Sequence, residues 1–169
     1  MSRPLIIVTD TSLLINFLHV DGMGVMARHS HGFIITDHVV EEITDHYEKQ
    51  RTTLAQAIKS GALQQVSLTS QDDLLLFAKL MQSGRLGTGE SSAIACAINN
   101  HHKLATDDKP AIVQAKAAAK DLEILRTQDL VVSMIQEKLI TVKDADHWKV
   151  EWETKYRFKL KIESFGDLI

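Results

Sequence analysis

Short apolar runs alternate along this chain with longer stretches of helical spacing. Five runs have strand length and end at turn or cap residues: LIIVT (5–9), FIIT (33–36), LQQVSL (63–68), HKLAT (102–106) and LEIL (122–125). Apolar residues recur at 3.6-type spacing between them, and Gly61 and Gly84 close two of these segments, as glycines commonly do at helix ends. This alternation predicts a three-layer α/β fold, with a mainly parallel five-stranded sheet flanked by helices.

Composition adds few constraints. The chain has 169 residues, a length that suggests one domain able to bury its own core. Its single cysteine, Cys96, cannot form an internal disulfide. The sequence has no apolar run long enough for a membrane span, and its first residues lack a signal pattern. We therefore expect a cytoplasmic protein. The net charge of -3 argues against a protein that coats nucleic acid through bulk positive charge, although an enzyme needs only a local basic patch.

Acidic residues follow several of the predicted strands. In a parallel α/β sheet, ligands bind outside the carboxyl ends of the strands, so these positions matter for function. The acids at or just beyond strand ends, or in the first turn of the Ala/Ile-rich helix, are Asp10, Asp37, Glu41, Glu42, Glu90, Asp107 and Asp108.

Helix capping is one explanation for these acids. Asp10, Asp37 and Asp107 have the residue type and position of N-caps, and Glu90 is an acid in a first helical turn. Capping alone gives no reason for the acids to meet at one sheet edge, where carboxylates repel one another unless a divalent cation neutralises them. A set of oxygen ligands favours Mg²⁺ or Mn²⁺ over zinc.

The histidines are numerous but scattered. HSH (29–31) and HH (101–102) have no cysteine or second histidine pair at metal-ligand spacing, so we interpret them as loop residues.

Four motifs, in this order, together resemble those of the PIN-domain ribonucleases: DTS (10–12), VVEEI (39–43), GTGESSAIA (87–95) and LATDDK (104–109). The likeness covers about residues 5 to 130, and it is to the toxin (VapC-type) component of type II toxin–antitoxin systems in particular. A PIN-like nuclease domain over residues 1–140 is therefore expected.

The resemblance implies an endoribonuclease that uses Mg²⁺ or Mn²⁺ to hydrolyse RNA phosphodiester bonds. Its catalytic carboxylates are Asp10, Glu42, Glu90 and Asp108. The metal ligands are Asp10, Glu90 and Asp108, and Asp107 is either a helper beside them or an additional ligand. Ser12 and Thr106 support the site. A small antitoxin protein is the expected partner, and a homodimer is a further expectation. Gly89 is predicted to allow a tight turn into the helix that carries Glu90.

Residues 141–169 are predicted to form a helix and then a basic amphipathic strand, both packed on the same domain. Trp148 and Trp152 share one helical face and suit core packing or a dimer seam better than base stacking. Within residues 155–165, basic and apolar side chains alternate strictly from Lys155 to Ile162, which predicts a half-buried strand. Its basic face either protects an edge strand from pairing or binds RNA phosphates through Arg157, Lys159 and Lys161; an acidic partner is a third reading.

Two other classes fit parts of the pattern. One is a PIN-like binding module without catalytic activity, although all four acidic positions are filled here. The other is a receiver-type signalling domain, which is also a five-stranded parallel α/β fold. Receivers place paired acids after their first strand, whereas here a single acid, Asp10, is followed by Thr11.

Overall fold

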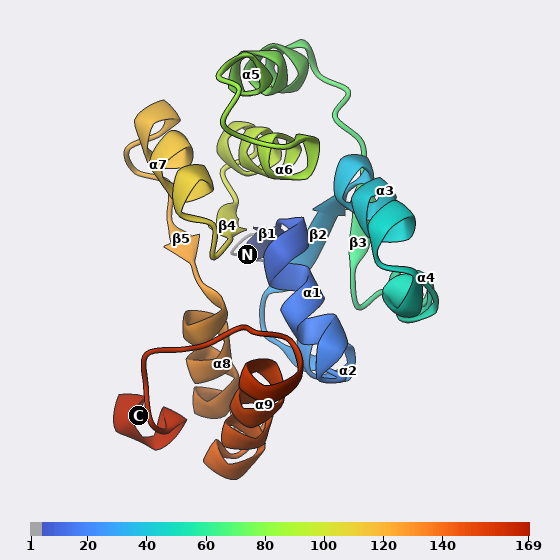
Figure 1. Cartoon of the computed structure of the whole chain (residues 1–169). Helices are drawn as coiled ribbons and strands as arrows, with labels where there is room; N and C mark the ends of the chain where they lie inside the picture. Colours follow the sequence, from blue (N-terminus) through green and yellow to red (C-terminus); the bar gives the residue numbers. More distant parts are fainter. Residues whose placement is uncertain (1–4) are drawn as a thin grey trace.

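The computed structural model describes residues 5–169, and its centre is a five-stranded parallel sheet (Figure 1). The strands are β1 (Ile6–Thr9), β2 (Gly32–Thr36), β3 (Gln64–Val66), β4 (Lys103–Ala105) and β5 (Ile124–Leu125). Each lies within two residues of a predicted run, so the parallel α/β prediction is confirmed. The strand order is β3-β2-β1-β4-β5, which differs from the 2-1-3-4-5 order of receiver-type folds.

Helices cover both faces of this sheet. They are α1 (Thr11–His19), α2 (Met23–Arg28), α3 (Asp37–His46), α4 (Arg51–Ser60), α5 (Gln71–Gln82), α6 (Thr88–Asn99), α7 (Lys109–Ala118), α8 (Thr127–Gln136) and α9 (Val142–Lys155), with short 3-10 helices η1 (Glu48–Gln50) and η2 (Phe165–Leu168). Helices α5, α6 and α7 lie on one side of the sheet, and α1, α2, α8 and α9 lie on the other (Figure 1). Within residues 5–169, none of the helices combines the length and the apolar character that a bilayer crossing requires.

Successive strand residues point into two separate hydrophobic cores. Ile7 and Phe33 belong to the core under α1, α8 and α9, whereas their neighbours Val8 and Ile34 belong to the core under α6 and α7. This period of two, in the largely apolar central strands β1 and β2, is what a sheet buried on both faces requires.

The C-terminal helix α9 forms where it was predicted and packs into the first core. Trp152 is fully buried, its ring meets that of Phe17 edge-on at 6.0 Å, and its Nε1 donates a hydrogen bond to the backbone oxygen of Asn16 at 2.7 Å. Trp148 packs against the same Phe17 ring at 6.2 Å. Both tryptophans therefore serve as core residues in this chain.

The strand predicted over residues 155–165 does not form. Lys155 is the last residue of α9, Arg157 adopts a left-handed φ of 57°, and the following segment pairs with no strand of the sheet. Phe158, Leu160 and Ile162 still pack against the first core, and the basic residues between them are exposed. Alternate burial needs only an extended chain lying on apolar surface, so the pattern was correct but the inference of a paired strand was wrong.

Replacing Trp152 with Phe should lower the free energy of unfolding by about 1–2 kcal/mol, because the Asn16 carbonyl loses its buried donor. Chemical denaturation of the two single variants measures this effect, with Trp148→Phe as the control. Trp148→Phe makes the same change of side-chain volume without removing a hydrogen bond from Asn16, so its effect should be smaller. An equal loss in both variants would mean that packing alone accounts for the contribution of Trp152.

Candidate functional site

Asp10 lies at the carboxyl end of the central strand β1, where it begins α1. Its Oδ1 accepts a hydrogen bond from the amide of Leu13 at 3.0 Å, so it is the N-cap that the sequence suggested. Its Oδ2 accepts from the Thr106 hydroxyl, which follows the neighbouring strand β4. Ser12 Oγ lies 3.3 Å from both carboxylate oxygens. Both residues expected to support the site, Ser12 and Thr106, therefore contact Asp10.

The Asp10 carboxylate is only 1% exposed, and this burial raises its pKa from 3.8 to about 7. Hydrogen bonds from Thr106 and Leu13 oppose the rise, and the charges of Glu90 and Asp107 add to it. A carboxyl group with this pKa is only about half ionised at pH 7, because removal from water penalises its charged form, and a nearby positive charge would favour the anion.

Glu42 reaches the same region from α3. Thr11 Oγ1 donates a hydrogen bond to Glu42 Oε2, so the first residue of α1 is joined to the middle of α3 there. The Thr36 and Ser92 hydroxyls, 2.6 Å apart, also connect the end of β2 to α6. Because Thr36 is also the N-cap of α3, these two bonds connect α3 to α1 and to α6.

Gly89 is needed for space and not for a turn. A Cβ atom at this position would lie 2.7 Å from Thr11 Oγ1 and closer still to the Glu42 carboxylate. Its φ is not among the left-handed angles of the described residues, so the predicted reason for this glycine was wrong. The missing side chain lets Glu42 approach the amino end of α6.

Glu90 lies in the first turn of α6, as predicted. Its Oε2 accepts a hydrogen bond from the amide of Gly87 at 3.1 Å. Burial raises the pKa of Glu90, the Gly87 amide opposes this, and the charges of Asp108 and Glu42 raise it further. These opposing effects indicate that the carboxylates share one electrostatic environment.

The adjacent acids Asp107 and Asp108 have different partners. Asp108, and not Asp107, caps α7: it accepts a hydrogen bond from the amide of Ala111 at 2.9 Å. Asp107 accepts from the amide and hydroxyl of Thr127 and from the Asn16 side chain, the last at 3.4 Å. Asp107 therefore connects α1 to α8 and uses both of its oxygens in doing so.

Sequence reasoning overlooked Thr11, Asn16 and Thr127. Asn16 carried a signal, because it is the polar residue inside the apolar run LLINFL (13–18). Thr127 comes two residues after β5, at the same carboxyl edge as the acids. Thr11 has no such signal, because its contact with Glu42 depends on how α3 is placed.

Asp37 is not an N-cap, although its position suggested one. Thr36 caps α3 by accepting a hydrogen bond from the amide of Val39 at 3.3 Å. Asp37 accepts hydrogen bonds from Ser67 and Gln65, and these bonds lower its pKa. It is a structurally satisfied acid at the same sheet edge, which makes it a useful control residue.

The four proposed catalytic carboxylates come from four segments of the chain, and the structure does not bring their oxygen atoms into one close cluster. Across residues 5–169, no three of Asp10, Glu42, Glu90 and Asp108 have ligand atoms all within 4.8 Å of one another. Mutual repulsion keeps carboxylates apart when no cation lies between them. They are nevertheless close enough for the charge of Glu90 to act on Asp10, and for those of Asp108 and Glu42 to act on Glu90.

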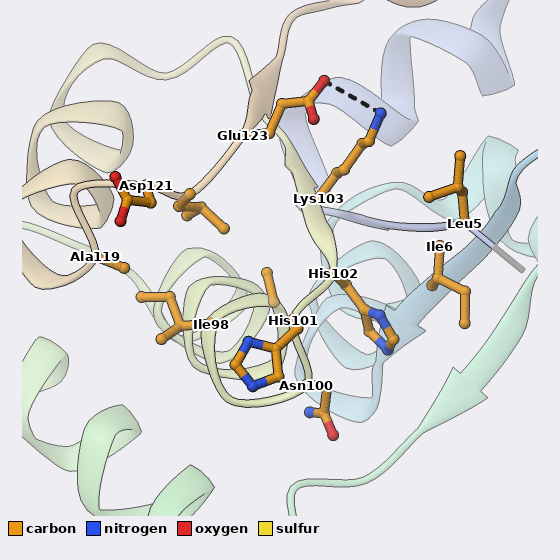
Figure 2. A pocket seen from close by; sticks show the side chains of 12 residues that line it. Leu5, Ile6, Ile98, Asn100, His101, His102, Lys103, Ala119, Asp121 and Glu123 are labelled. Atoms are coloured by element: carbon orange, nitrogen blue, oxygen red, sulfur yellow. Dashed lines mark ion pairs between the residues drawn. The ribbon is translucent and has the colours of Figure 1, made fainter. Parts of the chain in front are cut away.

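A pocket lies at the other edge of the sheet, away from these acids (Figure 2). It is lined by residues around the amino ends of β1 and β4, including Ile6, His102 and Lys103, and Lys103 pairs with Glu123 at 3.1 Å. None of the predicted site residues lines this pocket.

Replacing Asp10 with Asn should stabilise the metal-free protein, and more so at pH 8 than at pH 5. The folded-state pKa of Asp10 is raised above its unfolded value, so wild-type stability falls between about pH 4 and pH 7, while Asn does not titrate. The difference between the two pH values should be on the order of 2 kcal/mol, measured by denaturation in a chelator. Asp37→Asn is the control, and it should lower stability slightly at pH 8 because the pKa of Asp37 is lowered in the folded state. Equal effects of Asp10→Asn at both pH values would contradict this account of its burial.

Comparisons with known proteins identify the family to which the chain belongs. No curated protein sequence matches the chain. Among solved structures, PAE2754 from Pyrobaculum aerophilum is similar with a TM-score of 0.54 and 16% identity, covering 78% of this chain and 90% of that one. The VapBC2 structure from Rickettsia felis, bound to a DNA fragment from their promoter, is similar with a TM-score of 0.51 and 14% identity, covering 72% of this chain and 98% of that one. At these identities the likeness is one of fold.

The sequence itself matches a family model (DUF3368) described as a PIN domain over residues 6–148. This match spans all five strands and every acid of the carboxyl edge. The chain belongs to the PIN-domain family.

Proposed function

We propose that this chain is an endoribonuclease that depends on Mg²⁺ or Mn²⁺ and cuts RNA at the carboxyl edge of its sheet. The observation that carries the proposal is the placement of the Asp10 carboxylate, which is buried at the carboxyl end of the central strand and close enough to Glu90 and Asp107 to interact with their charges. Membership of the PIN-domain family and the resemblance of its motifs to PIN-domain ribonucleases support the same activity.

The donor set fits such an ion. Asp10, Glu90 and Asp108 are the proposed ligands, and carboxylate oxygens are the donors that Mg²⁺ and Mn²⁺ prefer. Asp107 already accepts three hydrogen bonds from Thr127 and Asn16, which favours a positioning role for it. When bound, the ion supplies a positive charge for the scissile phosphate and lowers the pKa of a water molecule.

The protein groups then have separate tasks. Thr106 and the Leu13 amide fix the orientation of Asp10, so its carboxylate does not need to reorganise during the reaction. Glu42, held by Thr11 against α6, either completes the set of ligands or orients the attacking water. Arg157, Lys159 and Lys161 are exposed on the C-terminal segment and are proposed to contact RNA phosphates.

The proposed biological role is that of the toxin in a toxin–antitoxin pair. The fold similarity to the VapBC2 structure from Rickettsia felis supports this role and a small antitoxin protein as partner. A binding module with the same fold is the alternative. The presence of all four acids favours the enzyme, because a module that does not cleave has no need to keep the Asp10 charge buried.

Replacing single carboxylates tests the activity. Asp10→Asn and Glu42→Gln should each reduce the rate of RNA cleavage in Mg²⁺ or Mn²⁺ by about 100-fold or more, because each removes a charge from the site. Matched controls are Asp37→Asn, at the same sheet edge, and Glu41→Gln, the exposed neighbour of Glu42, and both should cleave like wild type. Cleavage is followed on labelled RNA with and without a chelator. A folded wild-type protein that cuts no RNA in either metal would favour the binding module.

Gly89→Ala should reduce cleavage by about 10- to 100-fold while the protein remains folded. The added methyl group meets the flexible end of Glu42 and the Thr11 hydroxyl, so the backbone has no need to move but the carboxylate must. Circular dichroism verifies folding beside the cleavage assay. The control is Gly24→Ala in α2, where a Cβ meets nothing within 4 Å. If both alanine variants cleave like wild type, the position of Glu42 is not important for the reaction.

A further inference from the structure

A second cluster of potential metal ligands lies at the opposite edge of the sheet from the acids. His29 and His31 are in the loop between α2 and β2, and Glu137 directly follows α8. Each side chain offers one potential ligand atom, and these three atoms all lie within 4.8 Å of one another. Within residues 5–169, this is the group of three His, Cys, Asp or Glu side chains that lies close enough together to hold one metal ion. The two histidines precede the first residue of β2, whereas Asp10 follows the last residue of β1, so the two sites occupy different ends of the strands.

The cluster contains an unsatisfied buried atom. Nε2 of His31 is buried and has no hydrogen-bond partner in the described part of the chain. A buried polar atom left without a partner carries a desolvation cost of about 1–3 kcal/mol, and a bond to a metal ion would remove that cost. The His29 side chain is 1% exposed and that of Glu137 is 28% exposed, so solvent and ions can reach the cluster from the Glu137 side.

Neighbouring groups already orient the three side chains. The amide of Ser30 donates to Glu137 Oε2 at 3.0 Å, and its hydroxyl donates to Oε1. Nε2 of His29 lies 2.5 Å from Ser133 Oγ and 3.6 Å from Glu137 Oε1. Hydrogen bonds of this kind, made by atoms beyond the ligands, fix the orientation of imidazole and carboxylate ligands in metal sites.

The electrostatic environment permits a cation. Lys103, the nearby positive charge, is paired with Glu123 at 3.1 Å. Burial lowers the pKa of both His29 and His31, which favours the neutral imidazole form that binds metal ions. Nδ1 of His29 accepts the amide hydrogen of His31 at 3.0 Å, so binding of a metal ion through Nε2 requires the ring proton to move to Nδ1 and this hydrogen bond to be lost.

We propose that His29, His31 and Glu137 bind one zinc ion. Two imidazoles and one carboxylate are a zinc ligand set, and such a site leaves the fourth tetrahedral position to water. Mg²⁺ prefers oxygen ligands alone and is not expected here. The ion links the loop before β2 to the C-terminal end of α8, two segments that the sequence separates widely. This site is independent of the proposed nuclease reaction.

Zinc binding to the full chain tests the site. Protein stripped with a chelator is dialysed against ZnCl₂ in excess Mg²⁺, which occupies the acidic edge, and bound zinc is measured together with the thermal unfolding midpoint. Wild type should bind one zinc ion and melt at a higher temperature with zinc than without. His31→Ala and Glu137→Gln should each weaken binding by at least about tenfold and lose the zinc-induced shift. Glu137→Gln keeps an acceptor for Ser30, so it should fold normally.

Two controls separate this site from other sources of zinc binding. His147→Ala removes an exposed histidine that pairs with Glu151 on α9, and it should bind zinc like wild type. Asp10→Asn removes the central acid of the other edge and should also retain the zinc. The proposal is overturned if wild type binds no zinc at micromolar concentration, or if His31→Ala and Glu137→Gln bind it as tightly as wild type.

Discussion

The burial of one carboxylate, Asp10, governs the carboxyl edge of this sheet. Because β1 is the central strand, a residue at its end is enclosed by helices and by the neighbouring strand ends, and Asp10 is almost fully removed from water. Thr106 and the Leu13 amide compensate part of the cost by donating hydrogen bonds. The remainder persists as a raised pKa, and a cation is the natural partner for a charge held in this way.

The other acids are placed by close contacts between helices. Glu42 reaches α6 because Gly89 has no side chain, and the hydroxyls of Thr36 and Ser92 hold α3 and α6 together. A single methyl group in this gap would displace the Glu42 carboxylate, which comes from a position about fifty residues earlier in the sequence. Small residues at such contacts are therefore as important for the geometry of the site as the charged ones.

The sequence predicted the strands well because residues in a doubly buried parallel sheet are apolar in short, bounded runs. It also predicted that Asp10 follows the first strand and that Glu90 lies in the first turn of a helix, because capping is a local property. It did not reveal that Asp107 is held by Asn16 and Thr127, since those contacts join residues about ninety and twenty positions away. The strand predicted from the alternating C-terminal segment was wrong for a similar reason. Alternation indicates which side chains are buried, but a strand also needs a hydrogen-bonded neighbour, and the local sequence does not show whether the fold places one there.

Helix α8 connects the two edges of the sheet. Its first residue, Thr127, donates two hydrogen bonds to Asp107 at the carboxyl edge, and Glu137 follows its last residue at the amino edge. Ten residues of α-helix form a stiff rod of about 15 Å. Ser133 and Glu137 contact the loop that carries His29 and Ser30, so one helix and the residue after it contribute side chains to both edges. The potential ligand atoms at the carboxyl edge are oxygens, whereas those at the amino edge are mainly nitrogens. The two edges therefore suit different classes of metal ion, although both are connected to α8.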